Sequence, residues 1–151
     1  MKTDNIRRFV EANRSLLKQA LPSFTRSLEK CRRIDLSADF SFNEEEAFDA
    51  LTSKFSRISD IYTQKVLKSL AFLLREDAPT FIDRMNLCEK LGVLPSAEDM
   101  ISIRDLRNLI AHEYITENLL EVYRETVTLS DKLLAAIDQT DRHIENLKAE
   151  G

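Results

Sequence analysis

The chain has 151 residues and a formal net charge of -4, and it contains only 2 glycines and 3 prolines. Average usage of about 7% Gly and 5% Pro would give roughly 18 of the two together. This scarcity excludes turn-rich β-sandwiches and barrels, Gly-rich phosphate loops and collagen-like sequence. With 43% hydrophobic and 32% charged residues, the composition predicts an all-α fold, an up-and-down bundle of four or five helices in one domain.

The sequence also bears on the location of the protein and on the state of its cysteines. It begins without a hydrophobic stretch of the signal-peptide kind, and no apolar run approaches the ~20 residues that span a bilayer. We therefore expect a cytoplasmic protein with no membrane partner. Cys31 and Cys88 lie far apart in dissimilar settings, which favours reduced thiols over a disulfide or a metal pair.

Apolar residues at helical spacing predict two long helices in the first half of the chain. The first covers residues 4–33, and Pro22 is expected to kink or split it. A polar connection over 34–41 leads into the longest helix. We expect this helix to begin with Asn43 as its N-cap, followed by three glutamates in the first turn, and to continue to residue 73.

Three more helices are predicted in the second half of the chain. A short helix over 79–91 has proline at its start and Gly92 directly after its end, which is the favoured pattern for both termini. Ser96 is the expected N-cap of the fourth helix, which continues to about His112. Residues 116–118 begin the last, long helix, whose apolar stripe continues almost to the C-terminus.

The fourth helix and its exit hold the one concentrated set of chemistry-bearing residues, Arg104-Asp105-Leu106-Arg107-Asn108-Leu109-Ile110-Ala111-His112-Glu113-Tyr114. Arg104, Asn108 and His112 follow one another at i, i+4 and i+8 along a polar stripe. Arg107 lies about 140° from His112 on a regular helix. One chain therefore does not force these two groups to converge. Two copies packed through this face across a two-fold axis would bring both arginines and both histidines into one cleft.

These residue types suit the cleavage of an RNA phosphodiester without a metal. Such cleavage needs a base for the 2′-hydroxyl proton, an acid for the leaving oxygen and a cation for the charge that develops on the phosphorane. His112 suits proton transfer near neutral pH, and the planar fork of Arg107 suits phosphate oxygens. Asn108 would orient either group. The alternative is a solvated or helix-capping surface, with His112 near a helix C-terminus and Tyr114 at the core boundary.

The segment from Arg107 to Tyr114 resembles the Arg-x4-His-x-Tyr signature of HEPN-domain proteins. It is most similar to the HepT branch, the toxin partners of MNT-type nucleotidyltransferases. The predicted helix order over residues 43–147 also matches that family. The resemblance implies a bundle of HEPN type, with residues 1–151 as a single HEPN-like domain and a homodimer joined through the motif face. It further implies a metal-independent RNA endonuclease without a cofactor, in which Arg107 and His112 are the catalytic pair and Asn108 assists.

The same resemblance implies a role for Tyr114 and a protein partner. In the HepT branch, a type VII toxin–antitoxin system, the MNT-type nucleotidyltransferase antitoxin attaches AMP to the motif tyrosine, here Tyr114. Such an adduct, two residues from His112, adds bulk and negative charge that repel an RNA phosphate. A second HEPN branch works as a non-catalytic substrate- or nucleotide-binding subunit of a nucleotidyltransferase complex, and this is the alternative function.

Other residues are weaker candidates. Arg104 in the motif helix and Lys54 and Arg57 on the long second helix are candidate RNA contacts, although their spacing also suits an ordinary exposed face. His143 lies on a charged helix and is expected to be solvated. No histidine lies at ligand spacing from the glutamates at 44–46, so we predict no metal site.

Overall fold

The computed structural model of the protein describes residues 2–37, 39–112 and 119–150, and the regular structure within these ranges is entirely helical. The elements are α1 (Lys2–Arg32), α2 (Phe42–Ile61), the π-helical segment η1 (Tyr62–Leu67), α3 (Lys68–Leu73), α4 (Phe81–Lys90), α5 (Ala97–Ala111) and α6 (Leu119–Glu150). Because η1 joins α2 to α3 without a break, the described residues form five helical rods. The prediction of an all-α bundle is confirmed. None of these helices has both the length and the apolar character needed to cross a membrane.

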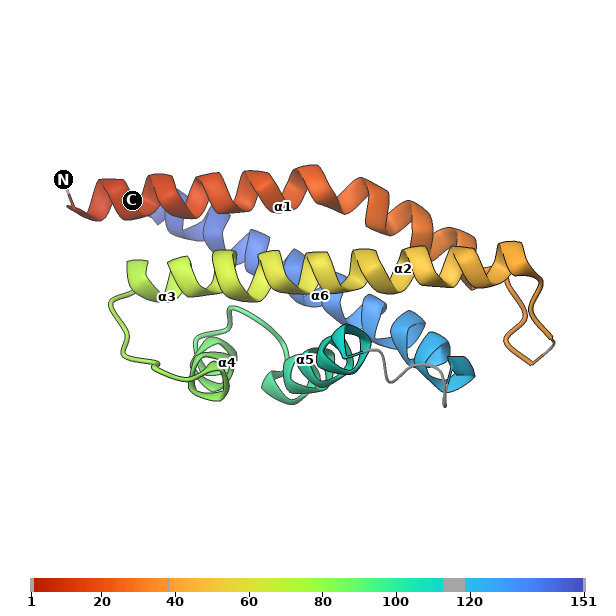
Figure 1. The fold of residues 1–151 in the computed structure, drawn as a ribbon. Helices are drawn as coiled ribbons and strands as arrows, with labels where there is room; N and C mark the ends of the chain where they lie inside the picture. Colours follow the sequence, from red (N-terminus) through yellow and green to blue (C-terminus); the bar gives the residue numbers. More distant parts are fainter. Residues whose placement is uncertain (1, 38, 113–118, 151) are drawn as a thin grey trace.

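The three long rods form the frame of the bundle. The α2–η1–α3 rod runs in the opposite direction to α1 and packs along it, and α6 crosses behind both (Figure 1). The short helices α4 and α5 are drawn nearly end-on, because their axes run across the long rods. The motif helix α5 contacts both α2 and α6, and α4 packs against it. These contacts hold one face of α5 against the α2–η1 rod.

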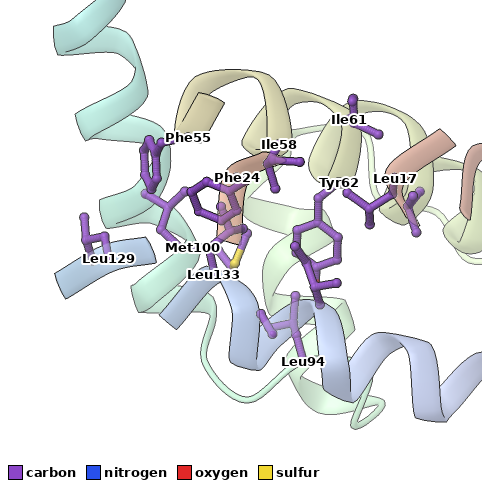
Figure 2. Packing of buried hydrophobic residues seen from close by; sticks show 14 of the residues in the cluster. Leu17, Phe24, Phe55, Ile58, Ile61, Tyr62, Leu94, Met100, Leu129 and Leu133 are labelled. Carbon is purple, nitrogen blue, oxygen red and sulfur yellow. The ribbon is translucent and has the colours of Figure 1, made fainter. Parts of the chain in front are cut away.

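One apolar core connects the helices. Phe24 from α1, Phe55 from α2 and Leu133 from α6 converge in it, and all three side chains are fully buried (Figure 2). Tyr62 from η1 is also fully buried. Its hydroxyl group lies 2.7 Å from the hydroxyl group of Thr140 on α6, so the one polar atom of the ring is satisfied inside the core.

The helix starts follow the capping rules, with two corrections to the prediction. The helix α4 begins at Phe81 with Thr80 as its N-cap, so Pro79 lies before the helix and not at its start. Ser41, not Asn43, is the N-cap of α2. The Ser41 hydroxyl accepts the backbone N–H of Glu44 at 3.2 Å, and the Glu44 carboxylate accepts the backbone N–H of Ser41 at 3.0 Å. This reciprocal arrangement satisfies two N–H groups at once. Ser96 caps α5 as predicted, and it accepts the N–H of Asp99 at 3.1 Å.

Proline and glycine affect the helices in different ways. Pro22 does not split α1, which continues through it to Arg32, and the axis of the helix bends in its second half (Figure 1). Gly92 directly follows the last turn of α4 with a φ of 75°, a conformation that glycine adopts at little cost. This turn lets the N–H of Val93 donate to the carbonyl oxygen of Cys88 at 2.8 Å, so a carbonyl group in the last turn of α4 has a partner. The helix therefore ends just before Gly92, as predicted.

The two cysteines are free and buried, so the prediction of reduced thiols is confirmed. Burial raises the pKa of both the Cys31 and the Cys88 thiol to about 11. Very little thiolate therefore exists near neutral pH, and neither group is a reactive nucleophile.

The π-helical segment η1 was not predicted. Its wider turn displaces backbone carbonyl groups from the regular helical pattern, and side chains supply hydrogen bonds to them. The Thr63 hydroxyl donates to the carbonyl oxygen of Ser59 at 2.8 Å, and the buried Asn13 on α1 donates to that of Lys65 at 3.3 Å. The first of these contacts lies on the side of the rod that faces α5.

Candidate functional site

A cavity of about 320 Å³ lies between the α2–η1 rod and the motif helix α5. One wall comes from α5, and the others come from the α2–η1 junction and from the start of α4. The lining is mostly polar and consists of Ser59, Asp60, Thr63, Gln64, Phe81, Arg104, Arg107 and Asn108. Three motif-helix residues that we singled out from the sequence, Arg104, Arg107 and Asn108, therefore share one cavity.

Arg107 is held by a carboxylate on the opposite wall of this cavity. Its Nε and Nη2 atoms donate to the two carboxylate oxygens of Asp60, each at 2.8 Å. The hydrogen bonds to Asp60 raise the pKa of Arg107 above its ordinary value, so this group stays charged. A bidentate pair of this kind also fixes the plane of the guanidinium group.

The Asp60 pair occupies one edge of the Arg107 guanidinium group. The pair uses Nε and one hydrogen of Nη2, and the opposite edge presents Nη1 and the second hydrogen of Nη2. A tetrahedral phosphate fits that second edge with two parallel hydrogen bonds. Arg107 can therefore bind Asp60 and a phosphate at the same time.

Arg104 lies against an aromatic ring at the other end of the cavity. Its guanidinium carbon is 4.6 Å from the centre of the Phe81 ring, which is a cation–π contact. Both side chains are half-buried, and Arg104 also lies 3.8 Å from the carboxylate of its neighbour Asp105. The ring restricts the position of the Arg104 cation, in the way that Asp60 restricts Arg107.

His112 lies at the end of α5. It is the C-cap residue of the helix, its side chain is exposed, and its backbone N–H donates to the carbonyl oxygen of Asn108 at 3.1 Å. The lining of the cavity includes Arg107 and Asn108 but not His112. The described part of one chain thus places Arg107 inside the cavity and His112 at the helix end. Tyr114 lies outside the described residues.

The remaining predicted residues lie away from the cavity. The Lys54 ammonium group donates to the Ser27 hydroxyl on α1 at 2.9 Å, so this side chain faces α1. Arg57 is exposed on α2, one turn before Asp60, and is not among the residues that line the cavity. His143 on α6 is half-buried.

The wall of the cavity that lies opposite α5 was not predicted from the sequence. Asp60 is separated from Arg107 by 47 positions, and no local pattern connects the two. Asp60 is an isolated acid in a stretch that otherwise carries basic residues, Arg57 and Lys65. This isolation is the one feature of the sequence that could have indicated a special role for Asp60. Phe81 lies within the helix predicted over 79–91, and its sequence context has no signature of a cation–π partner.

Comparison with known proteins adds no further assignment. No family model matches the chain, and no curated protein matches it. Within the described ranges, no group of three or more histidine, cysteine, aspartate or glutamate side chains gathers in a way that would hold a metal ion. The motif helix and the cavity beside it are therefore the features that bear on function.

Proposed function

We propose that this protein is a HEPN-type, HepT-like toxin, a cytoplasmic RNA endonuclease that cleaves without a metal and works as a homodimer through the motif face. The observation that carries the proposal is the cavity that Arg104, Arg107 and Asn108 of the motif helix share. Support also comes from the order of helices, in which the short α4 is followed by the capped α5 and the long α6. The Arg-x4-His-x-Tyr motif provides the residue types that the proposed cleavage and its regulation require.

In the proposed reaction, the ribose of the substrate supplies the nucleophile. One His112 imidazole removes the proton of a 2′-hydroxyl group, and the 2′-oxygen attacks the neighbouring phosphorus. Arg107 stabilises the additional negative charge of the phosphorane, and Asn108 orients the reacting groups. The 5′-oxygen then leaves with a proton, which the histidine of the second copy donates. The products are a 2′,3′-cyclic phosphate and a 5′-hydroxyl end.

The charges of the cavity support a phosphodiester as its ligand. Arg104 and Arg107 each carry one positive charge and Asp60 carries one negative charge, so these three residues sum to +1. A phosphodiester carries one negative charge and balances this sum. The chain as a whole has a net charge of -4, which discourages binding of RNA outside such a site.

The contact between Arg107 and Asp60 gives a direct test of the proposed site. In Asp60→Asn, an amide nitrogen replaces one of the two acceptors of Arg107, so the guanidinium group loses its fixed position. We expect kcat for RNA cleavage to fall about tenfold, which corresponds to roughly 1.4 kcal/mol. KM should not rise, because the positive charge of the cavity increases. Steady-state kinetics on a fluorescent RNA measures both constants.

A matched control for this variant is Asp138→Asn, which changes an exposed aspartate on α6 and should leave both constants unchanged. An unchanged kcat in Asp60→Asn would show that the pair with Arg107 plays no part in catalysis. A raised KM with normal kcat would assign Asp60 to RNA binding instead.

The proposed regulation by a nucleotidyltransferase antitoxin predicts a covalent change at Tyr114. Co-expression with an MNT-type nucleotidyltransferase should add AMP to Tyr114 and remove RNA cleavage. Peptide mass spectrometry locates the adduct. Tyr62 and Tyr123 are internal controls, because both rings are fully buried and should remain unmodified. The regulation is refuted if Tyr114 carries no adduct, or if Tyr114→Phe is neutralised as effectively as the wild type.

One observation favours the second candidate function, a non-catalytic binding subunit of a nucleotidyltransferase complex. Asp60 already pairs with Arg107, and the cavity does not include His112. A site of this composition suits the binding of a nucleotide without its cleavage. This alternative predicts stable association with the nucleotidyltransferase and intact RNA under all conditions, so an RNA cleavage assay separates the two functions.

A further inference from the structure

We propose that the cavity between α1, η1 and α6 is a binding site for a small aliphatic carboxylate, with the alkyl chain inside the cavity and the carboxylate on Lys18 at its mouth. The cavity has a volume of about 250 Å³ and lies where the three long rods of the bundle meet (Figure 1). Tyr62 and Val66 of η1 line it, whereas Thr63 and Gln64 of η1 line the cavity beside the motif helix. The two sites therefore use different faces of η1, and binding here does not depend on RNA cleavage.

The interior of this cavity is apolar and large enough for more than a single small ring. Its wall is formed by aliphatic side chains and one aromatic ring from the three rods, and these include Leu17, Tyr62, Val66, Leu134, Ile137 and Ile144. An engineered cavity of about 150 Å³ with a lining of this kind stays dry and binds benzene. A space of about 250 Å³ with such a wall therefore suits a longer apolar group, such as an alkyl chain.

The polar atoms inside the cavity already have partners. The Thr140 hydroxyl donates to the carbonyl oxygen of Val93 at 2.9 Å, so it accepts the hydroxyl of Tyr62, which lies 2.7 Å away. The buried Arg14 guanidinium group donates from each of its three nitrogens to a different carboxylate, at distances of 2.6 to 3.3 Å. A polar group that entered this space would lose its water without gaining a free partner, which favours an apolar chain.

Lys18 is the cation that remains available at the mouth of the cavity. Its side chain is 58% exposed, and its ammonium group lies 3.8 Å from Oδ1 of Asp141, beyond hydrogen-bonding distance. That oxygen already accepts the Nε–H of Arg14 at 2.6 Å. The second acid at the mouth, Asp138, pairs with Arg142 at 3.2 Å. Because both acids have a closer cation than Lys18, the mouth offers a partner to a carboxylate and not to an ammonium group.

The alkyl part of the site is tested by isothermal titration calorimetry of the full chain with butanoate, hexanoate, octanoate and decanoate, each below its micelle concentration. Burial of each added methylene group should strengthen binding about threefold to fourfold, until the chain fills the cavity and the affinity stops rising. Leu134→Trp places a larger side chain in the half-buried wall and should weaken octanoate about tenfold or more. Circular dichroism checks that this variant keeps its helix content. An affinity that does not change along the series overturns the site.

The carboxylate is tested with octanoate, octanol and octylamine, which share one alkyl chain. Octanoate should bind about 1.5- to 5-fold more tightly than octanol, the gain expected from one exposed ion pair, and octylamine should bind most weakly. Lys18→Gln changes an exposed side chain, and it should remove the difference between octanoate and octanol while octanol binds as before. Lys30→Gln, at an exposed lysine on the same helix outside the cavity, is the matched control and should bind all three ligands as the wild type does.

Two results overturn the carboxylate as the ligand. One is octylamine that binds as tightly as octanoate, and the other is a preference for octanoate that survives in Lys18→Gln. These titrations contain no RNA, so a negative result leaves the proposed ribonuclease standing, and a protein that cleaves no RNA can still bind octanoate.

Discussion

RNA cleavage by His112→Ala is expected to be about 100- to 10,000-fold slower than cleavage by the wild-type protein. The loss has this size because proton transfer by a positioned side chain contributes that much to such reactions. His112 is exposed at the end of α5, so the alanine variant should keep the melting temperature of the wild type. Single-turnover cleavage of a labelled RNA measures the rate constant. In cells, His112→Ala should no longer inhibit growth when it is expressed.

The other histidine provides the matched control. His143→Ala on α6 removes the same chemical group from a position outside the motif, and it should retain both RNA cleavage and growth inhibition. Arg107→Ala should lose about 100- to 1,000-fold in rate, as expected for the loss of a group that stabilises charge in the transition state. Equal cleavage and equal toxicity of the wild type, His112→Ala and Arg107→Ala would refute the catalytic assignment.

Phe24→Ala is expected to destabilise the protein by about 3–5 kcal/mol, because it leaves a large cavity in the core between α1, α2 and α6. The Phe24 side chain is 0% exposed. A loss of this size is a large part of the roughly 5–15 kcal/mol that stabilises a typical domain. Urea denaturation followed by circular dichroism gives the free energy of unfolding of the variant and of the wild type.

Phe9→Ala is the control for this substitution, since it makes the same change on the same helix at a side chain that is 61% exposed. It should change the free energy of unfolding by less than about 0.5 kcal/mol. Similar losses in the two variants would mean that the packing of α1 against α2 and α6 differs from the one described.

Much of the fold was predictable because its determinants are local. Apolar residues at helical spacing predicted the long helices, and the chemistry of Ser96 and Gly92 placed two helix ends. The wrong N-cap of α2 has a local cause too, since the spacing of Ser41 and Glu44 forms a reciprocal cap that the run of glutamates obscured. The π-helical segment η1 was not predictable, because no local pattern specifies it or the hydrogen bond that Asn13 of a different helix donates to its Lys65 carbonyl oxygen.

The candidate site was predictable on one side only. The spacing of Arg104 and Asn108 placed both on one stripe of α5, and the structure brings both to one cavity. The opposite wall depends on how α5 crosses the long rod, which no periodicity within either helix specifies. For this reason neither the bond from Asp60 to Arg107 nor the contact of Phe81 with Arg104 was expected.

The low content of glycine and proline agrees with the way in which this site is built. With 2 glycines and 3 prolines, the chain has few positions for a loop that binds phosphate through its backbone. The cavity is instead formed by side chains on helices that cross each other, and a carboxylate and an aromatic ring hold its two cations in place.

The most direct test of the proposed ribonuclease is the incubation of purified protein with RNA in excess EDTA, followed by analysis of the product ends. We predict cleavage with 2′,3′-cyclic phosphate and 5′-hydroxyl ends by the wild type and by His143→Ala, and cleavage at least about 100-fold slower by His112→Ala. RNA that stays intact with the wild type, or that is cleaved only after a divalent metal ion is added, would contradict the proposed function.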